Sequence, residues 1–167
     1  MKLKLRTISL FKILVLLVIA GFLFYHFLPK AEYIKPSNAL LTINNQTFLV
    51  ELAKIDQERM QGLSGRKNLG ENEGMLFLFP APFRYSFWMK DMNFNLDFIF
   101  MNNNEVVDLA ENIPFPKNGE QPEVVMAKKD FDKVLEVNTG VIAKANIKIG
   151  DMVDLTQADG EEKKISN

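Results

Sequence analysis

The stretch Ser86–Phe100, SFWMKDMNFNLDFIF, surrounds a Lys-Asp pair with five aromatic residues and then places one carboxylate, Asp97, in an apolar run. A β-strand points successive side chains to opposite faces. One face would therefore carry Phe94, Leu96, Phe98 and Phe100, and the other Asn93, Asn95, Asp97, Ile99 and Met101. We expect a strand with an aromatic face, and a partly buried Asp97 on the opposite, half-apolar face.

The flanking sequence also predicts strands. Residues 39–53 form two β-rich runs joined at Asn44-Asn45, which suits a tight hairpin turn, and residues 96–110 repeat this pattern around Asn102–Asn104. Two apolar runs on either side of Pro80-Ala81-Pro82 predict two strands joined by a proline turn.

Helical signals are short. Asp56 is a plausible N-cap and Gly62 a stop for one helix, and a helical turn is expected over residues 141–145, between strands at 133–138 and 151–155. The predicted fold class is mainly β: a compact antiparallel β-barrel or sandwich with one or two short helices, preceded by one N-terminal transmembrane helix.

The N-terminal thirty residues contain five basic residues and no acidic one. Residues 8–28, with Lys12 reaching toward the headgroups, give about 21 residues, enough to cross a bilayer core. No small-x-small cleavage pattern follows, so an uncleaved anchor is favoured over a signal peptide. The positive-inside tendency places the N-terminus in the cytoplasm and the domain outside, in the periplasm or at the cell surface.

This organisation predicts a signal anchor over 1–30, a tether over 31–38, the β domain over 39–157 and a polar tail over 158–167. Without the anchor, 15 basic residues face 21 acidic ones, a net charge of −6, and no basic stripe remains for nucleic acid.

The residue types present in the domain exclude several classes of catalytic and metal-binding site. His26, in the anchor, is the only histidine and there is no cysteine, so the domain lacks the residues for Ser-His-Asp or Cys-His catalysis and for a His/Cys metal site. Carboxylates remain, and paired ones serve glycosidases or bind Ca²⁺ and Mg²⁺. The candidates are Glu73, Asp91, Asp97 and Glu136. We assign no catalytic residue, metal or cofactor.

Several motifs occur in a fixed order: Arg59 with Gly62-Leu63, then Glu73–Phe77 (EGMLF), Phe87–Lys90 (FWMK), Leu96–Phe100 (LDFIF) and Leu135–Asn138 (LEVN). In order and spacing the chain resembles the family of domain of unknown function 192 over most of residues 40–155. The resemblance implies a small, mainly β domain, often behind a signal or anchor, and no established activity. The chain departs from the family pattern at Asp91, Met92 and Asn95.

A partly buried Asp97 needs a cationic partner. The favoured interpretation is a structural ion pair between Asp97 and Arg59. The alternative is a ligand-binding cluster at a pocket mouth, formed by Arg59, Glu73, Trp88, Lys90 and Asp97. For Glu136 a solvated strand face is favoured over a pocket wall.

These observations predict an uncharacterised, membrane-anchored extracytoplasmic domain that binds a small polar ligand. Two alternatives stay open. One is a structural or assembly protein of the cell envelope that acts through protein–protein contacts, and the other is a carboxylate-dependent hydrolase.

Overall fold

The computed structural model describes residues 13–15, 17–20 and 38–157 of the 167-residue chain. The chain divides into two units, Met1–Lys35 and Pro36–Asn167. In the first unit, residues 13–15 and 17–20 are helical. Among all residues described, no helix combines the length and apolar character needed to cross a bilayer. Most of the predicted anchor and tether, and all of the predicted tail, lie outside the described residues.

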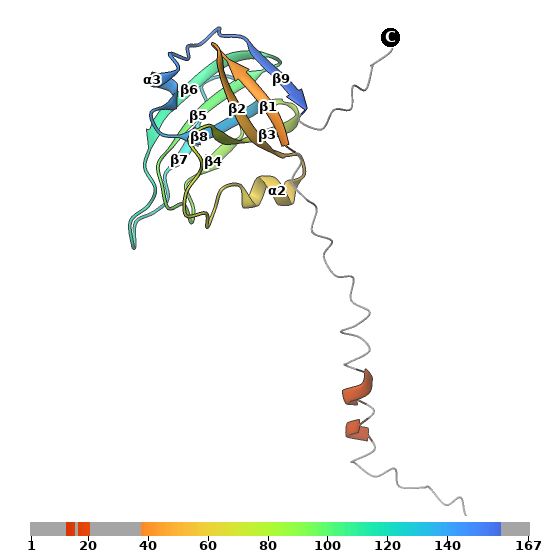
Figure 1. Cartoon of the computed structure of the whole chain (residues 1–167). Coiled ribbons are helices and arrows are strands. Elements are labelled where there is room, and N and C mark those ends of the chain that lie inside the picture. Colours follow the sequence, from red (N-terminus) through yellow and green to blue (C-terminus); the bar gives the residue numbers. More distant parts are fainter. Residues whose placement is uncertain (1–12, 16, 21–37, 158–167) are drawn as a thin grey trace, which may run out of the picture. The chain divides into compact units, whose positions relative to one another are not determined.

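The second unit is built on a seven-stranded sheet (Figure 1). Its spatial order is β6-β5-β8-β3-β2-β1-β9. The strands are β1 (Asn38–Ile43), β2 (Gln46–Ala53), β3 (Glu73–Phe83), β5 (Leu96–Asn102), β6 (Glu105–Ile113), β8 (Phe131–Asn138) and β9 (Val153–Gln157). The sheet curls into a half-barrel, and an isolated antiparallel bridge between Glu105 and Met152 brings its two edges together.

A second, two-stranded sheet pairs β4 (Ser86–Trp88) with β7 (Val124–Met126), and two short helices, α2 (Asp56–Gln61) and α3 (Val141–Lys144), complete the described elements. The predicted mainly β fold with short helices is confirmed. One detail of the prediction is wrong: β2 and β3 pair in parallel, because the segment containing α2 carries the chain back before β3 begins.

Asparagines form the tight turns that the sequence predicts. Asn44 and Asn45 have φ of 49° and 66° between β1 and β2, and Asn103 has φ of 54° between β5 and β6. Asparagine tolerates this left-handed backbone better than most residues. Both predicted hairpins are therefore confirmed.

The predicted turn at Pro80-Ala81-Pro82 is wrong, because β3 continues through it to Phe83. Proline cannot donate a backbone hydrogen bond to a neighbouring strand. The pairing of β3 with β8 is accordingly interrupted between Leu78 and Phe83, where the register shifts. Only Arg84 and Tyr85 separate the end of β3 from β4, which begins at Ser86.

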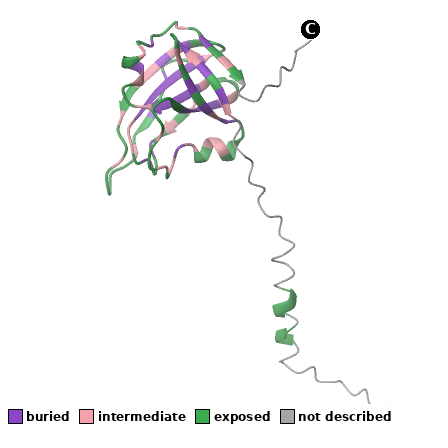
Figure 2. Ribbon diagram, viewed as in Figure 1, coloured by how far each residue is buried: buried purple, intermediate pink, exposed green. Residues whose placement is uncertain are grey.

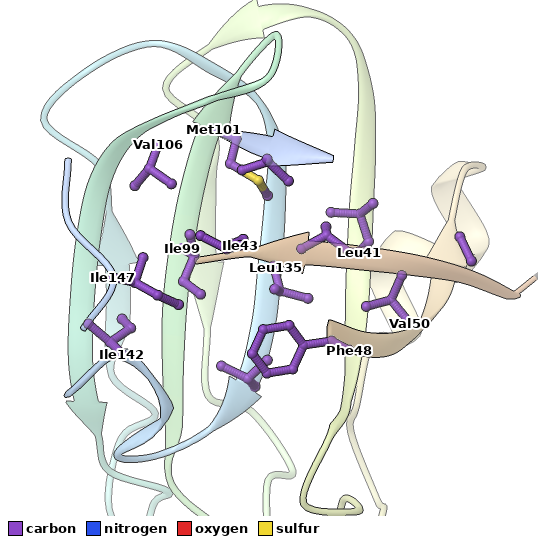
Figure 3. Packing of buried hydrophobic residues seen from close by; sticks show 14 of the residues in the cluster. Leu41, Ile43, Phe48, Val50, Ile99, Met101, Val106, Leu135, Ile142 and Ile147 are labelled. Carbon is purple, nitrogen blue, oxygen red and sulfur yellow. The ribbon is translucent and has the colours of Figure 1, made fainter. Parts of the chain in front are cut away.

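Buried residues lie along the strands of the curled sheet (Figure 2). Their side chains form two clusters, and successive residues of β5 belong to different ones. Figure 3 shows the first, with Leu41, Ile43, Phe48, Val50, Ile99 and Leu135 among its members. The second contains Phe77, Phe98, Phe100 and Phe131 on the opposite face of the sheet. As predicted, Phe98 and Phe100 share one face of β5, and Ile99 and Met101 share the other.

Candidate functional site

A cavity of about 520 Å³ lies beside the second cluster. Its walls come from the strands β3, β5 and β8, from α2 with the segment after it, and from the chain around β4. We call it the Glu136 pocket. Its lining residues are Asp56, Arg59, Met60, Gln61, Gly62, Leu63, Ser64, Phe77, Phe79, Tyr85, Ser86, Phe87, Trp88, Met92, Leu96 and Glu136.

Aromatic rings make up much of the wall. Phe79 stacks on Tyr85 with ring centroids 4.0 Å apart, and Phe77 meets Phe87 edge to face at 5.2 Å. Such ring pairs stabilise each other beyond the area that they bury. Trp88 also lines the pocket, yet 57% of it is exposed to solvent, so it lies at the mouth.

Glu136 is the polar group set deepest in this wall. It belongs to β8, between β3 and β5, and its register partners on those strands are Met75 and Phe98, both members of the second cluster. Glu136 is only 6% exposed. Among the described residues, none donates a hydrogen bond to its carboxyl group or pairs with it as a cation. Burial raises the pKa of Glu136 to about 8.

Gly74 explains how β3 comes so close to β8 beside this residue. A Cβ atom at Gly74 would lie 2.9 Å from the backbone oxygen of Glu136 and 2.9 Å from Leu135 Cδ1. Any larger side chain would push the two strands apart. The glycine of the EGMLF motif therefore has a packing role next to the pocket.

Arg59 forms part of the wall through α2. One guanidinium nitrogen donates to the backbone oxygens of Lys54 and Leu78, at 2.5 and 2.8 Å, and the other pairs with Asp56 at 2.5 Å. The guanidinium carbon lies 5.4 Å from the centroid of the Phe79 ring. These contacts tie α2 to β3 and hold Arg59 in place beside the cavity.

The structure brings together only part of the predicted ligand-binding cluster. Arg59 and Trp88 both line the Glu136 pocket, and Lys90 is adjacent to its mouth, with its ammonium 5.1 Å from the centroid of the Trp88 ring. Glu73 and Asp97 do not line it. Glu73 instead accepts a hydrogen bond from the backbone N–H of Gly70 at 3.0 Å.

The predicted ion pair between Asp97 and Arg59 is wrong. Asp97 is fully buried and accepts hydrogen bonds from the backbone N–H groups of Asn112, at 2.8 Å, and Ile142, at 3.0 Å. Two backbone donors satisfy the carboxylate without a cation. Asp97 thus ties the end of β6 and the start of α3 to β5, a structural role that differs from the one expected.

The favoured solvated position of Glu136 is also wrong, and the alternative of a pocket wall describes its place. The alternation of apolar Leu135, charged Glu136 and apolar Val137 is typical of a strand with one solvent-exposed face. The sequence does not reveal that β8 lies in the middle of the sheet with an aromatic cluster over that face. Of the four carboxylates considered for catalysis, Glu136 alone lines this pocket. Within the described residues, no group of three His, Cys, Asp or Glu side chains is arranged to hold a metal ion.

Comparison with known proteins gives a consistent picture of the fold. No curated protein matches the chain. A crystal structure from Sinorhizobium meliloti 1021, whose description suggests a transcription regulator, is 24% identical and superposes with a TM-score of 0.66 over 74% of this chain and 98% of that one. At this identity the likeness shows the fold alone. A protein of unknown function from Novosphingobium aromaticivorans DSM 12444 is 30% identical, with a TM-score of 0.62 over 76% of this chain and 92% of that one.

The family model agrees with the motifs quoted from the sequence. It matches residues 39–155, from the second residue of β1 into β9, and therefore includes part or all of every strand of the curled sheet. The chain belongs to the DUF192 family, described as Uncharacterized ACR.

Proposed function

We propose that this protein is a small-molecule-binding domain whose site is the Glu136 pocket. The observation that carries the proposal is a nearly buried carboxyl group, without a partner among the described residues, in the wall of an aromatic cavity. Burying such a group costs free energy unless something compensates it. A carboxyl group kept in a cleft with a displaced pKa is a common feature of binding and catalytic sites.

The dimensions and lining suit a small ligand. A volume of about 520 Å³ falls in the range of roughly 300–1,000 Å³ that is usual for ligand pockets. Aromatic rings would contact an apolar body, while Gln61, Ser64 and Ser86 offer polar groups along the same wall. The ligand that fits is therefore amphipathic, with one polar group directed to Glu136.

We also propose that the domain is held at the outer side of a membrane by residues 8–28. The argument is the sequence: an apolar run long enough to cross a bilayer, with basic residues concentrated before it. An extracytoplasmic pocket would meet small molecules of the periplasm or cell surface.

Thermal unfolding of the full chain, screened with small aromatic compounds, tests the binding proposal. A compound that binds only the folded state raises the unfolding midpoint. Trp88→Ala should abolish or strongly reduce the shift, because it removes a ring from the mouth of the pocket. Val124→Ala is the matched control: Val124 is the exposed cross-strand partner of Trp88 and does not line the pocket. Equal shifts in both variants would reject the site.

A second candidate, assembly with another envelope protein, is favoured by the outer face of the β4–β7 sheet. Trp88, Val124 and Met126 are 57%, 59% and 62% exposed, and they lie on neighbouring strands. A lysine in place of Met126 should then disrupt a complex seen on native gels of membrane extracts without changing any ligand-induced thermal shift. An unchanged complex would reject this candidate.

A further inference from the structure

The titratable and charged groups of the Glu136 pocket determine whether it accepts a positively or a negatively charged ligand. Those in its wall are Asp56, Arg59, Tyr85 and Glu136. Asp56 and Arg59 pair with each other. The Tyr85 hydroxyl donates to the backbone oxygen of Ala81 at 3.0 Å. The carboxyl group of Glu136 is the member of this set that has no partner among the described residues.

The strands on either side place no charged side chain at the register positions opposite Glu136. The side chains next to Glu136 on β3 and β5 are Met75 and Phe98, so neither neighbouring strand supplies a cation or an amide donor at this level. A ligand that brings a positive charge to Glu136 would therefore supply the compensation that the protein does not.

The aromatic lining favours the same class of ligand. The faces of aromatic rings attract ammonium groups, and sites for alkylated ammonium ions are built from several such rings. The protein already uses this attraction at the mouth, where the Lys90 ammonium lies over Trp88, and in the wall, where the Arg59 guanidinium lies over Phe79. The rings of Phe77, Phe87 and Tyr85 line the same pocket as Glu136.

We propose that the ligand of the Glu136 pocket is a small organic cation, a primary amine or substituted ammonium ion with an apolar or aromatic body, whose charged nitrogen pairs with the Glu136 carboxylate. This inference depends on the proposed function, and it names the chemical class that the site selects. The matched neutral alcohol would bind weakly, and the matched carboxylate would be rejected by like charge above about pH 8, where Glu136 is ionised.

A definite pH dependence follows. The free pocket at pH 7 holds Glu136 mainly protonated, because burial raises its pKa to about 8. An amine stays charged at this pH, and pairing with it lowers the pKa of Glu136, so binding releases about one proton. The affinity for an amine therefore increases by about tenfold per pH unit up to about pH 8 and levels off above it. Affinity for a neutral alcohol shows no such increase.

Isothermal titration calorimetry on the full chain in lipid nanodiscs tests this with three probes of similar shape: phenethylamine, 2-phenylethanol and 3-phenylpropionate. Each titration is run at pH 6, 7 and 8, and at pH 7 in two buffers of different ionisation enthalpy, which counts the protons released. The inference requires phenethylamine to bind at least tenfold more tightly than the alcohol at pH 8, with proton release. Glu136→Gln should remove both the preference and the proton release.

The outcomes separate the two proposals. If the alcohol binds as tightly as the amine, without proton release, the cation inference is wrong while the binding function stands. If none of the three compounds binds at any pH, both are rejected for this class of aromatic body. The number of protons released when phenethylamine binds to the wild-type protein tests the cation inference even if Glu136→Gln fails to fold.

Discussion

Two carboxyl groups inside the same sheet are stabilised in opposite ways. Asp97 receives two backbone hydrogen bonds, whereas Glu136 faces an aromatic cavity and has no partner among the described residues. Both residues sit in apolar strands, and their local sequences, LDFIF and LEVN, do not distinguish them. At the scale of single residues, the partner of a buried charge is decided by which strands become neighbours.

The stability of the protein should depend on pH through Glu136. Its pKa is raised from 4.5 to about 8 in the folded state, so the folded chain holds the proton more tightly than the unfolded chain. The free energy of unfolding therefore falls as pH rises from about 4.5 to about 8, by at most ~1.4 kcal/mol per pH unit from this group. Urea unfolding at pH 5, 6.5 and 8 measures the slope. Glu136→Gln should flatten it, whereas Glu105→Gln, at an exposed position, should not.

The Asp97→Asn substitution should destabilise the fold by about 2–4 kcal/mol. The asparagine amide offers one acceptor oxygen where two backbone N–H groups now donate, and its NH₂ group would face one of those donors. Urea unfolding measures the loss. Asp154→Asn, on the exposed side of β9, should cost under about 0.5 kcal/mol. Equal effects of the two substitutions would contradict the role assigned to Asp97.

At the scale of elements, local chemistry predicts turns well and strand ends poorly. The asparagine pairs favour left-handed backbone whatever surrounds them, so both hairpins are visible in the sequence. The prolines of the Pro80-Ala81-Pro82 segment also favour a turn in the sequence. In the structure β3 continues through this segment, and only its pairing with β8 is interrupted. Only the tertiary arrangement shows whether a proline ends a strand or lies in an unpaired part of it.

The first hairpin turn offers a test of this reasoning. Asn45 is exposed with φ of 66°, so Asn45→Ala should destabilise the domain by about 1 kcal/mol and Asn45→Gly should leave it unchanged or slightly more stable. Thermal unfolding of the two variants provides the comparison. Alanine and glycine variants of equal stability would show that this turn does not need left-handed backbone.

At the scale of the whole molecule, the curled sheet separates the two clusters of buried side chains, which are enclosed in different ways. The first cluster is enclosed as the edges of the sheet meet near Glu105 and Met152. The second lies on the opposite face of the sheet, and the Glu136 pocket lies next to it. The sequence predicted Trp88 and Arg59 as site residues. The wall of the Glu136 pocket is built from segments between residues 56 and 136, and no local sequence pattern indicates that these segments meet.

The predicted anchor has its own test. In a bacterial host the full chain should stay with the membrane fraction after alkaline carbonate washing, because an apolar run near 21 residues partitions into the bilayer core. A chain lacking residues 1–30 should lose this association. Added protease should digest the domain on intact spheroplasts if it faces outward. Protection of the domain, or release of the full chain by carbonate, would contradict the proposed topology.

The central claim, that the Glu136 pocket binds small molecules, is tested most directly by NMR of methionine methyl groups labelled with ¹³C, observed in the full chain during titration with aromatic amines and alcohols. Met60 and Met92 line the pocket, Met101 lies buried in the first cluster, and Met126 is exposed on β7. The account predicts saturable shifts at Met60 and Met92 with Met101 and Met126 unchanged. The account would be contradicted if the Met60 and Met92 signals did not shift with any compound, or if shifts were confined to Met126.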